Sequence, residues 1–107
     1  MNRGEIWLSA RPSNSGHVQQ GVHPALIVIK STSHLVTVVP ITSSLNAARF
    51  QHAVTVEPTP MNGLARKSVL LVHQMGALDT SFLIKKIGVL DNNTLQEVMN
   101  EVRAFLE

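Results

Sequence analysis

Histidine is the residue type in this chain with the clearest capacity for chemistry, because the chain has five histidines and no cysteine. An unperturbed histidine, with a pKa of about 6.5, can act as a base or an acid near neutral pH. The lack of cysteine excludes disulfides, thiolate zinc sites and a cysteine nucleophile. No His-x-x-x-His or Glu-x-x-His spacing occurs, so we expect no metal site and no other cofactor. The five are His17, His23, His34, His52 and His73.

Two of the histidines belong to a polar segment that contains two glycines, Gly16–Pro24. His17 lies inside the segment, and His23 precedes its proline. An aliphatic run, Ala25–Ile29, follows directly and is typical of a buried strand. Loops beside rigid strands often carry sites, so both histidines are candidates for catalysis. Two further polar residues of the segment are candidates for contact with a polar ligand: Gln19 and Gln20.

Other candidates follow later apolar runs. Thr42 and Ser43 end the run Val39–Ile41, where a hydroxyl can donate to an anionic oxygen or satisfy a local backbone group. His73 comes directly after Val69–Val72, and a partly buried, hydrogen-bonded role suits it nearly as well as catalysis. Two more residues are candidates for ligand binding: Arg49, which could hold a phosphate and whose alternative is a solvated surface, and Gln74.

The charge distribution favours an anionic partner for the first half of the chain. The formal net charge is only +2, but no aspartate or glutamate occurs between Ile6 and Val56. That stretch contains three basic residues and four of the histidines. We interpret it as a candidate surface for a polyanion. A chance scarcity of acidic residues is the alternative.

The elements that must position these residues are mainly strands. Alternating or continuous apolar runs predict strands near residues 5–9, 25–30, 35–41, 52–56, 68–72 and 85–90. The second and third should form a hairpin, and residues 44–50 could form one helical turn or an ordered loop. A short helix is expected after Asp79. Five or six short strands imply a small antiparallel sheet, partly closed like a barrel.

The C-terminal segment predicts a helix. Asp91 suits its N-cap, and apolar residues from Leu95 to Leu106 recur at helical spacing. The helix should pack one apolar stripe onto the sheet. The length of 107 residues suggests one domain, residues 1–107. With no apolar span or signal region, we expect a cytoplasmic protein.

Several of these motifs together resemble the MazF/PemK (Kid-like) family of toxin–antitoxin endoribonuclease toxins, which cut single-stranded messenger RNA. The resemblance covers nearly the whole chain. It is carried by Arg3–Leu8, Gly16–Pro24, Val39–Ser44, Gly63-Leu64, Ser68–Leu70, Gln74 and Leu78-Asp79. It implies an antiparallel SH3-like barrel of the CcdB/MazF type, a homodimer, and metal-independent cleavage that leaves a 2′,3′-cyclic phosphate.

The resemblance also implies roles for individual residues. His17 stands where Kid-like members also carry histidine, and Thr42 matches a threonine that helps bind the scissile phosphate. His23 departs from the family, which usually has a catalytic arginine there, and His73 replaces a residue that is often acidic. His23 therefore weakens the enzyme or shifts it to imidazole chemistry. Its alternative is a residue placed by packing before proline.

The implied partners are single-stranded RNA and a cognate MazE/PemI-like antitoxin with an acidic disordered tail. DNA contact is expected only through the antitoxin, and no membrane contact is expected. Two other functions stay open. The chain could be a weakened or inactive MazF-like protein, or a CcdB-like, non-enzymatic inhibitor of a protein target such as gyrase.

Overall fold

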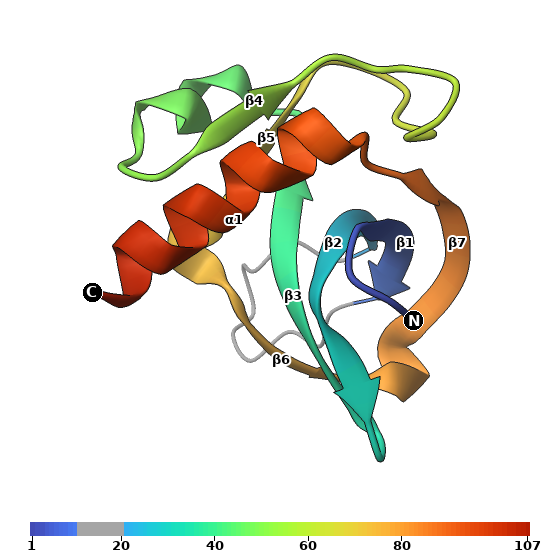
Figure 1. Cartoon of the computed structure of the whole chain (residues 1–107). Helices are drawn as coiled ribbons and strands as arrows, with labels where there is room; N and C mark the ends of the chain where they lie inside the picture. The colour runs from blue at the N-terminus through green and yellow to red at the C-terminus, as the bar shows by residue number, and fades with distance from the viewer. Residues whose placement is uncertain (11–20) are drawn as a thin grey trace.

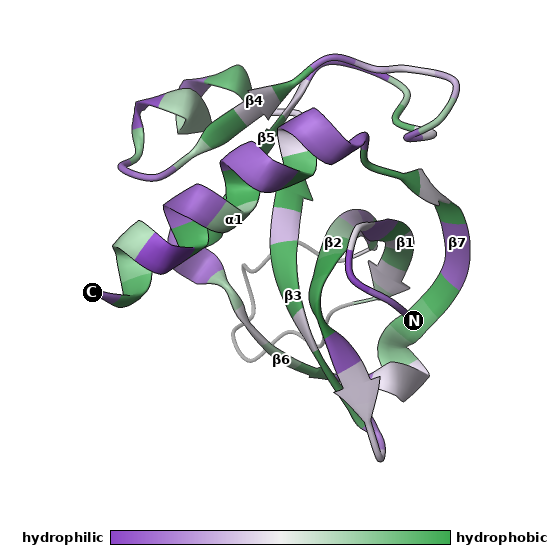
Figure 2. Cartoon of the chain, in the orientation of Figure 1, coloured by the Kyte–Doolittle hydropathy of each residue, from purple (hydrophilic) through white to green (hydrophobic). Residues whose placement is uncertain are grey.

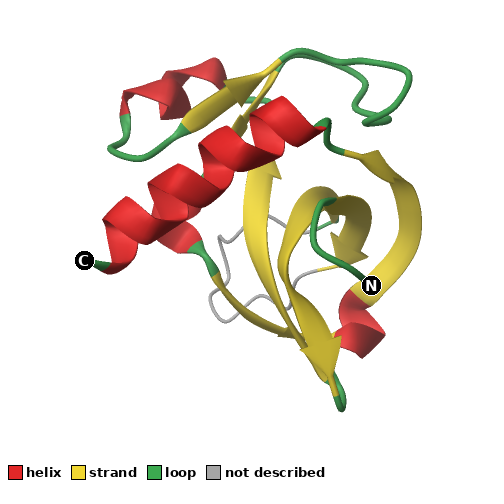
Figure 3. Cartoon of the chain, in the orientation of Figure 1, coloured by secondary structure: helices red, strands yellow, loops and turns green. Residues whose placement is uncertain are grey.

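Within residues 1–10 and 21–107, which the structure describes, seven β-strands form one antiparallel sheet (Figure 1). The structure is a computed structural model. The strands are β1 (Glu5–Ala10), β2 (Val22–Thr32), β3 (Leu35–Thr42), β4 (Val54–Val56), β5 (Ser68–Leu70), β6 (Gly76–Asp79) and β7 (Leu83–Val89). A helix, α1 (Asn92–Leu106), ends the chain. Three short 3₁₀ helices, drawn with α1 in red in Figure 3, are η1 (Leu45–Arg49), η2 (Val72–Gln74) and η3 (Thr80–Phe82).

The sheet follows the order β4-β5-β3-β2-β1-β7, and β6 also pairs with β3. It curls strongly, but its path stays open, with β4 at one end and β7 at the other (Figure 1). The mainly antiparallel, barrel-like class is confirmed, as is the hairpin between β2 and β3. The predicted helical turn near residues 44–50 is η1.

Several strand bounds differ from those predicted, including those of β2, β5 and β7, and two differences have a clear physical reason. β4 begins at Val54, two residues later than expected for the strand, because His52 has a positive φ of 70° and belongs to a turn. The sequence does not predict β6. Only one of its four residues, Leu78, is buried, so the sequence carries no alternation that would indicate a strand. Pairing with Leu35–Val38 of β3 creates it.

The core consists of two apolar clusters on opposite faces of the central hairpin. Leu26 and Val28 of β2 belong to the cluster under α1, whereas Ala25 and Ile27 belong to the other. All four are at most 1% exposed. This two-sided burial explains why the strand reads as a continuous aliphatic run, visible as green along β2 in Figure 2.

The helix α1 lies across the sheet, with β4 and β5 on one side of it and β6 on the other (Figure 1). Its predicted N-cap is confirmed, since the Asp91 carboxylate accepts a hydrogen bond from Thr94 N at 3.0 Å. Hydrogen bonds from Thr94 lower the pKa of Asp91. Val98 and Val102 are buried, but the last apolar residues, Phe105 and Leu106, are exposed. No helix in the described ranges is both long and apolar enough to cross a membrane.

Candidate functional site

A cavity of about 210 Å³ lies where β2 begins and β3 ends. Its polar lining residues come from three parts of the chain: His23 from β2, Ser43 from the end of β3, and Arg66 and Ser68 from the segment before and in β5. Apolar side chains, including Pro24 and Leu64, complete the wall. The cavity therefore combines an imidazole, hydroxyls and a guanidinium, which are groups that can bind a phosphate.

His23 is held at the cavity by its backbone. The fully buried Ser9 of β1 donates its hydroxyl to the carbonyl of His23 at 3.0 Å. The ring is half-buried, and its Nε2 atom is buried without a hydrogen-bond partner among the described residues. Buried polar atoms are normally hydrogen-bonded. Within the described residues, this ring nitrogen therefore has unused hydrogen-bonding capacity.

The hydroxyl of Thr42 has a local partner. Its Oγ1 accepts a hydrogen bond from Ser44 N at 3.1 Å, which shapes the turn after β3. The hydroxyl hydrogen remains free to donate, since Oγ1 acts only as the acceptor in this bond. The described lining of the cavity includes the next residue, Ser43, rather than Thr42. The turn that contains Thr42 and Ser43 thus contributes the hydroxyl of Ser43 to the cavity.

The segment that carries Arg66 is fixed by Asn62, which is only 2% exposed. The side-chain oxygen of Asn62 accepts from Thr59 N and Leu64 N, each at 3.0 Å. Its amide nitrogen donates to the carbonyl of Glu57 at 2.9 Å. One buried amide side chain therefore organises the chain between β4 and β5.

The same segment packs closely on β7 through two glycines. Gly63 has a φ of 70°, and a Cβ added to it would lie 2.1 Å from the carbonyl oxygen of Ile87. A Cβ added to Gly88 would lie 2.4 Å from Met61 O. The backbone also pairs directly, because Val89 N donates to Met61 O at 2.9 Å. Contact this close requires glycine on both sides.

The remaining described candidates form a separate cluster around Phe50. The rings of Phe50 and His73 have centroids 4.8 Å apart, and the guanidinium carbon of Arg49 lies 5.1 Å from the Phe50 ring centroid. Gln74 Nε2 lies 3.4 Å from His73 Nε2. His73 Nδ1, like His23 Nε2, is buried without a hydrogen-bond partner in the described residues. This Phe50 cluster does not contribute to the described lining of the cavity.

Three other candidates, His17, Gln19 and Gln20, lie outside the described residues. Within the described ranges, no group of three or more histidine, aspartate or glutamate side chains is arranged to hold a metal ion.

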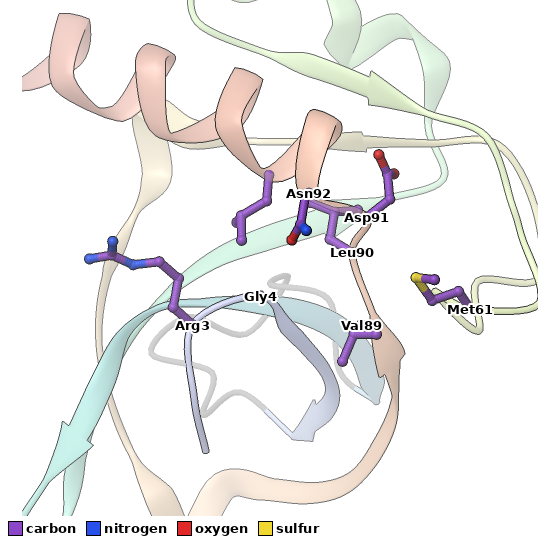
Figure 4. Close-up of a pocket in the computed structure, with 8 residues that line it drawn as sticks. Arg3, Gly4, Met61, Val89, Leu90, Asp91 and Asn92 are labelled. Carbon is purple, nitrogen blue, oxygen red and sulfur yellow. The ribbon is translucent and has the colours of Figure 1, made fainter.

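A second cavity, of about 310 Å³, lies at the start of α1 (Figure 4). None of the candidate residues lines it. Arg3 lies at its edge and donates from Nε to the carbonyl of Val28 at 2.7 Å. In Figure 4 its guanidinium points away from Asp91, whose carboxylate already caps the helix. The candidate site is therefore the cavity with His23.

Sequence reasoning missed Arg66. The only signal was the basic pair Arg66-Lys67 before a predicted strand, and nothing in the sequence separates the two. In the structure they differ, because the Lys67 ammonium lies 3.4 Å from the Glu57 carboxylate whereas Arg66 lines the cavity.

The protein is thus a small β-sheet protein with a curled antiparallel sheet, a terminal helix and a polar cavity at the strand ends. Known proteins share this architecture. Endoribonuclease MazF of Staphylococcus saprophyticus is 30% identical over 106 residues, which cover 95% of this chain and 88% of that protein. The crystal structure of MazF from Deinococcus radiodurans has a TM-score of 0.72 at 25% identity, covering 98% of this chain and 94% of that one. A MazE-MazF crystal structure from the same organism has a TM-score of 0.78 at 23% identity, covering 99% and 95%.

One protein family has a sequence model that matches residues 2–106, and its description is PemK-like, MazF-like toxin of type II toxin-antitoxin system. The chain belongs to this family. The resemblance found in the sequence motifs is thereby confirmed.

Proposed function

We propose that this chain, acting as one toxin domain over residues 1–107, is an endoribonuclease that cuts single-stranded mRNA without a metal ion. The observation that carries the proposal is the polar cavity lined by His23, whose buried Nε2 atom has no hydrogen-bond partner among the described residues. Its family and its 30% identity to an endoribonuclease support the reaction class. The acid-free first half supports an anionic substrate.

Cleavage requires two proton transfers and one displacement. A base takes the proton of the 2′-OH, the 2′ oxygen bonds to phosphorus, the bond between phosphorus and the 5′ oxygen breaks, and an acid protonates that oxygen. The products are a 2′,3′-cyclic phosphate and a 5′-OH end. Histidine can carry out either transfer.

The roles combine the described lining of the cavity with those that the family resemblance implies. The His23 ring donates an N–H to a non-bridging phosphate oxygen, and the hydroxyls of Thr42 and Ser43 donate to the same group. We assign one of the proton transfers to His17. The RNA beyond the scissile phosphate contacts Gln19 and Gln20 and, in the Phe50 cluster, Arg49, His73 and Gln74.

The test is incubation of a long mixed-sequence RNA with the purified protein in excess EDTA. We expect discrete fragments that end in 2′,3′-cyclic phosphate, since no step in the mechanism needs a metal. Intact RNA under these conditions and also with added Mg²⁺ would contradict the proposal. Inhibition of gyrase by the same sample would then favour the non-enzymatic CcdB-like alternative.

We further propose that the toxin acts in the cytoplasm as a homodimer and is neutralised by an antitoxin with an acidic, disordered tail. A related crystal structure is of MazE with MazF, and the acid-free half of this chain offers a surface of matching charge. DNA contact would come only through the antitoxin, with no membrane contact.

If the antitoxin tail covers the cavity, it must compete with RNA. We expect a peptide of the tail to displace a fluorescent RNA in an anisotropy titration, with the apparent affinity of the peptide falling as RNA concentration rises. A peptide in which alanines replace the acidic residues is the control, and it should displace RNA much less effectively. Simultaneous binding of RNA and the intact peptide would contradict a shared site.

A further inference from the structure

The described lining of the candidate cavity contains one side chain that is positively charged at every physiological pH, Arg66. We propose that Arg66 binds a non-bridging oxygen of the RNA phosphate at this cavity and supplies a charge there that does not depend on His23. This inference rests on the proposed function, because it names a further residue of the same site. Phosphate binding then involves the loop before β5 as well as β2.

The charge on Arg66 is not neutralised within the protein. Among the described residues, no carboxylate lies within ion-pair distance of Arg66, and no acidic residue lines the cavity. Residues 11–20 contain no aspartate or glutamate, so they offer no carboxylate either. The neighbouring Lys67, in contrast, pairs with Glu57 at 3.4 Å. Among the described residues that line the cavity, the permanent positive charge therefore comes from Arg66.

The backbone holds this guanidinium beside the cavity. Ser68, which is 4% exposed, donates its hydroxyl to the carbonyl of Arg66 at 2.8 Å. On the other side, Leu64 is buried in the cluster under α1, and its amide donates to Asn62. The chain is thus fixed on both sides of Arg66, while its side chain stays exposed. The Arg66 side chain can therefore reach a ligand without a rearrangement of the loop.

The guanidinium of Arg66 is chemically suited to bind an RNA phosphate. A guanidinium presents a planar fork of N–H donors that matches two oxygens of one phosphate, and its charge persists when histidine is neutral. Ser43 adds a hydroxyl donor to the lining of the same cavity. His23, Ser43 and Arg66 thus approach one bound phosphate from three elements of the fold.

The experiment compares Arg66→Ala with Lys67→Ala, which removes the same formal charge one residue away. We expect Arg66→Ala to lower kcat/KM for RNA cleavage by about 10²- to 10³-fold, with Lys67→Ala within about threefold of wild type. Arg66→Lys should recover only part of the loss, because an ammonium lacks the fork. Thermal melting of each variant verifies folding, and Arg66 is exposed, so all should melt alike.

A binding measurement separates this inference from the proposed function. With a single-stranded RNA methylated at its 2′-OH groups, Arg66→Ala should reduce the slope of log affinity against log salt by about 0.7, the value for one phosphate contact. Lys67→Ala should leave the slope close to that of wild type. If wild type cleaves RNA but Arg66→Ala and Lys67→Ala have the same activity and the same salt slope, the role of Arg66 is overturned and the proposed function stands. If wild type does not cleave RNA, the proposed function is overturned. Equal salt slopes for the two variants would then overturn the role of Arg66 as well.

Discussion

His23→Ala is expected to reduce the rate of RNA cleavage by about 10²- to 10³-fold, the usual cost of removing a donor that stabilises a transition state. The structure motivates this size because His23 lines the cavity and its Nε2 atom has no hydrogen-bond partner among the described residues. The measurement is single-turnover cleavage of a mixed-sequence RNA at saturating protein. Melting curves should be nearly unchanged, and a variant with the wild-type rate would remove His23 from the site.

His23→Arg is the matched variant, because it keeps a donor at the position and makes its charge permanent. We expect it to cleave faster than wild type. The measurement is the ratio of its single-turnover rate to the wild-type rate on the same RNA. An inert His23→Arg would contradict the nuclease proposal.

Gly88→Ala is expected to lower the stability of the fold strongly. The added methyl would meet the backbone of Met61 and Asn62 at 2.4 Å, and backbone atoms cannot rotate away. Such overpacking costs about 1–3 kcal/mol, which for a chain of this size lowers the melting temperature by about 5–20 °C. RNA cleavage should fall as well, because the shifted segment carries Arg66.

Gly76→Ala provides the control for that substitution. It makes the same chemical change in strand β6, where an added Cβ has no atom within 4 Å and no positive φ is needed. Its melting temperature should remain within about 2 °C of wild type, as is usual for substitutions away from tight contacts. Equal melting of the two variants would show that the close contact between β7 and residues 61–62 does not constrain the fold.

The sequence predicted those parts of the fold that leave a local signal. The aliphatic run at Ala25–Ile29 indicated a strand buried on both faces, and Asp91 marked the start of α1. β6 left no such signal, because it exists through pairing with β3 rather than through its own burial pattern. The exposed Phe105 and Leu106 were also beyond prediction, since the spacing of apolar residues does not reveal where the helix passes the edge of the sheet.

The site was predictable only where its residues end adjacent strands. His23 and Ser43 meet because β2 and β3 are antiparallel neighbours, which the hairpin pattern already implied. His73 comes from a run that also pairs with β3, but the 3₁₀ turn η2 redirects it toward Phe50. Arg66 reaches the cavity through a loop shaped by Asn62 and two glycines, and no periodicity in the sequence describes that path.

The two apolar clusters have a consequence for how the molecule opens. β2 and β3 contribute to both clusters, so separating these strands exposes the whole core at once. Their amide hydrogens should exchange with solvent only in global unfolding, whereas the segment between β4 and β5 can detach in a smaller, cheaper opening. His23 and Ser43 would then remain in place while Arg66 leaves. One wall of the cavity thus belongs to the slowest-exchanging part of the protein and the opposite wall to a cooperative unit of its own.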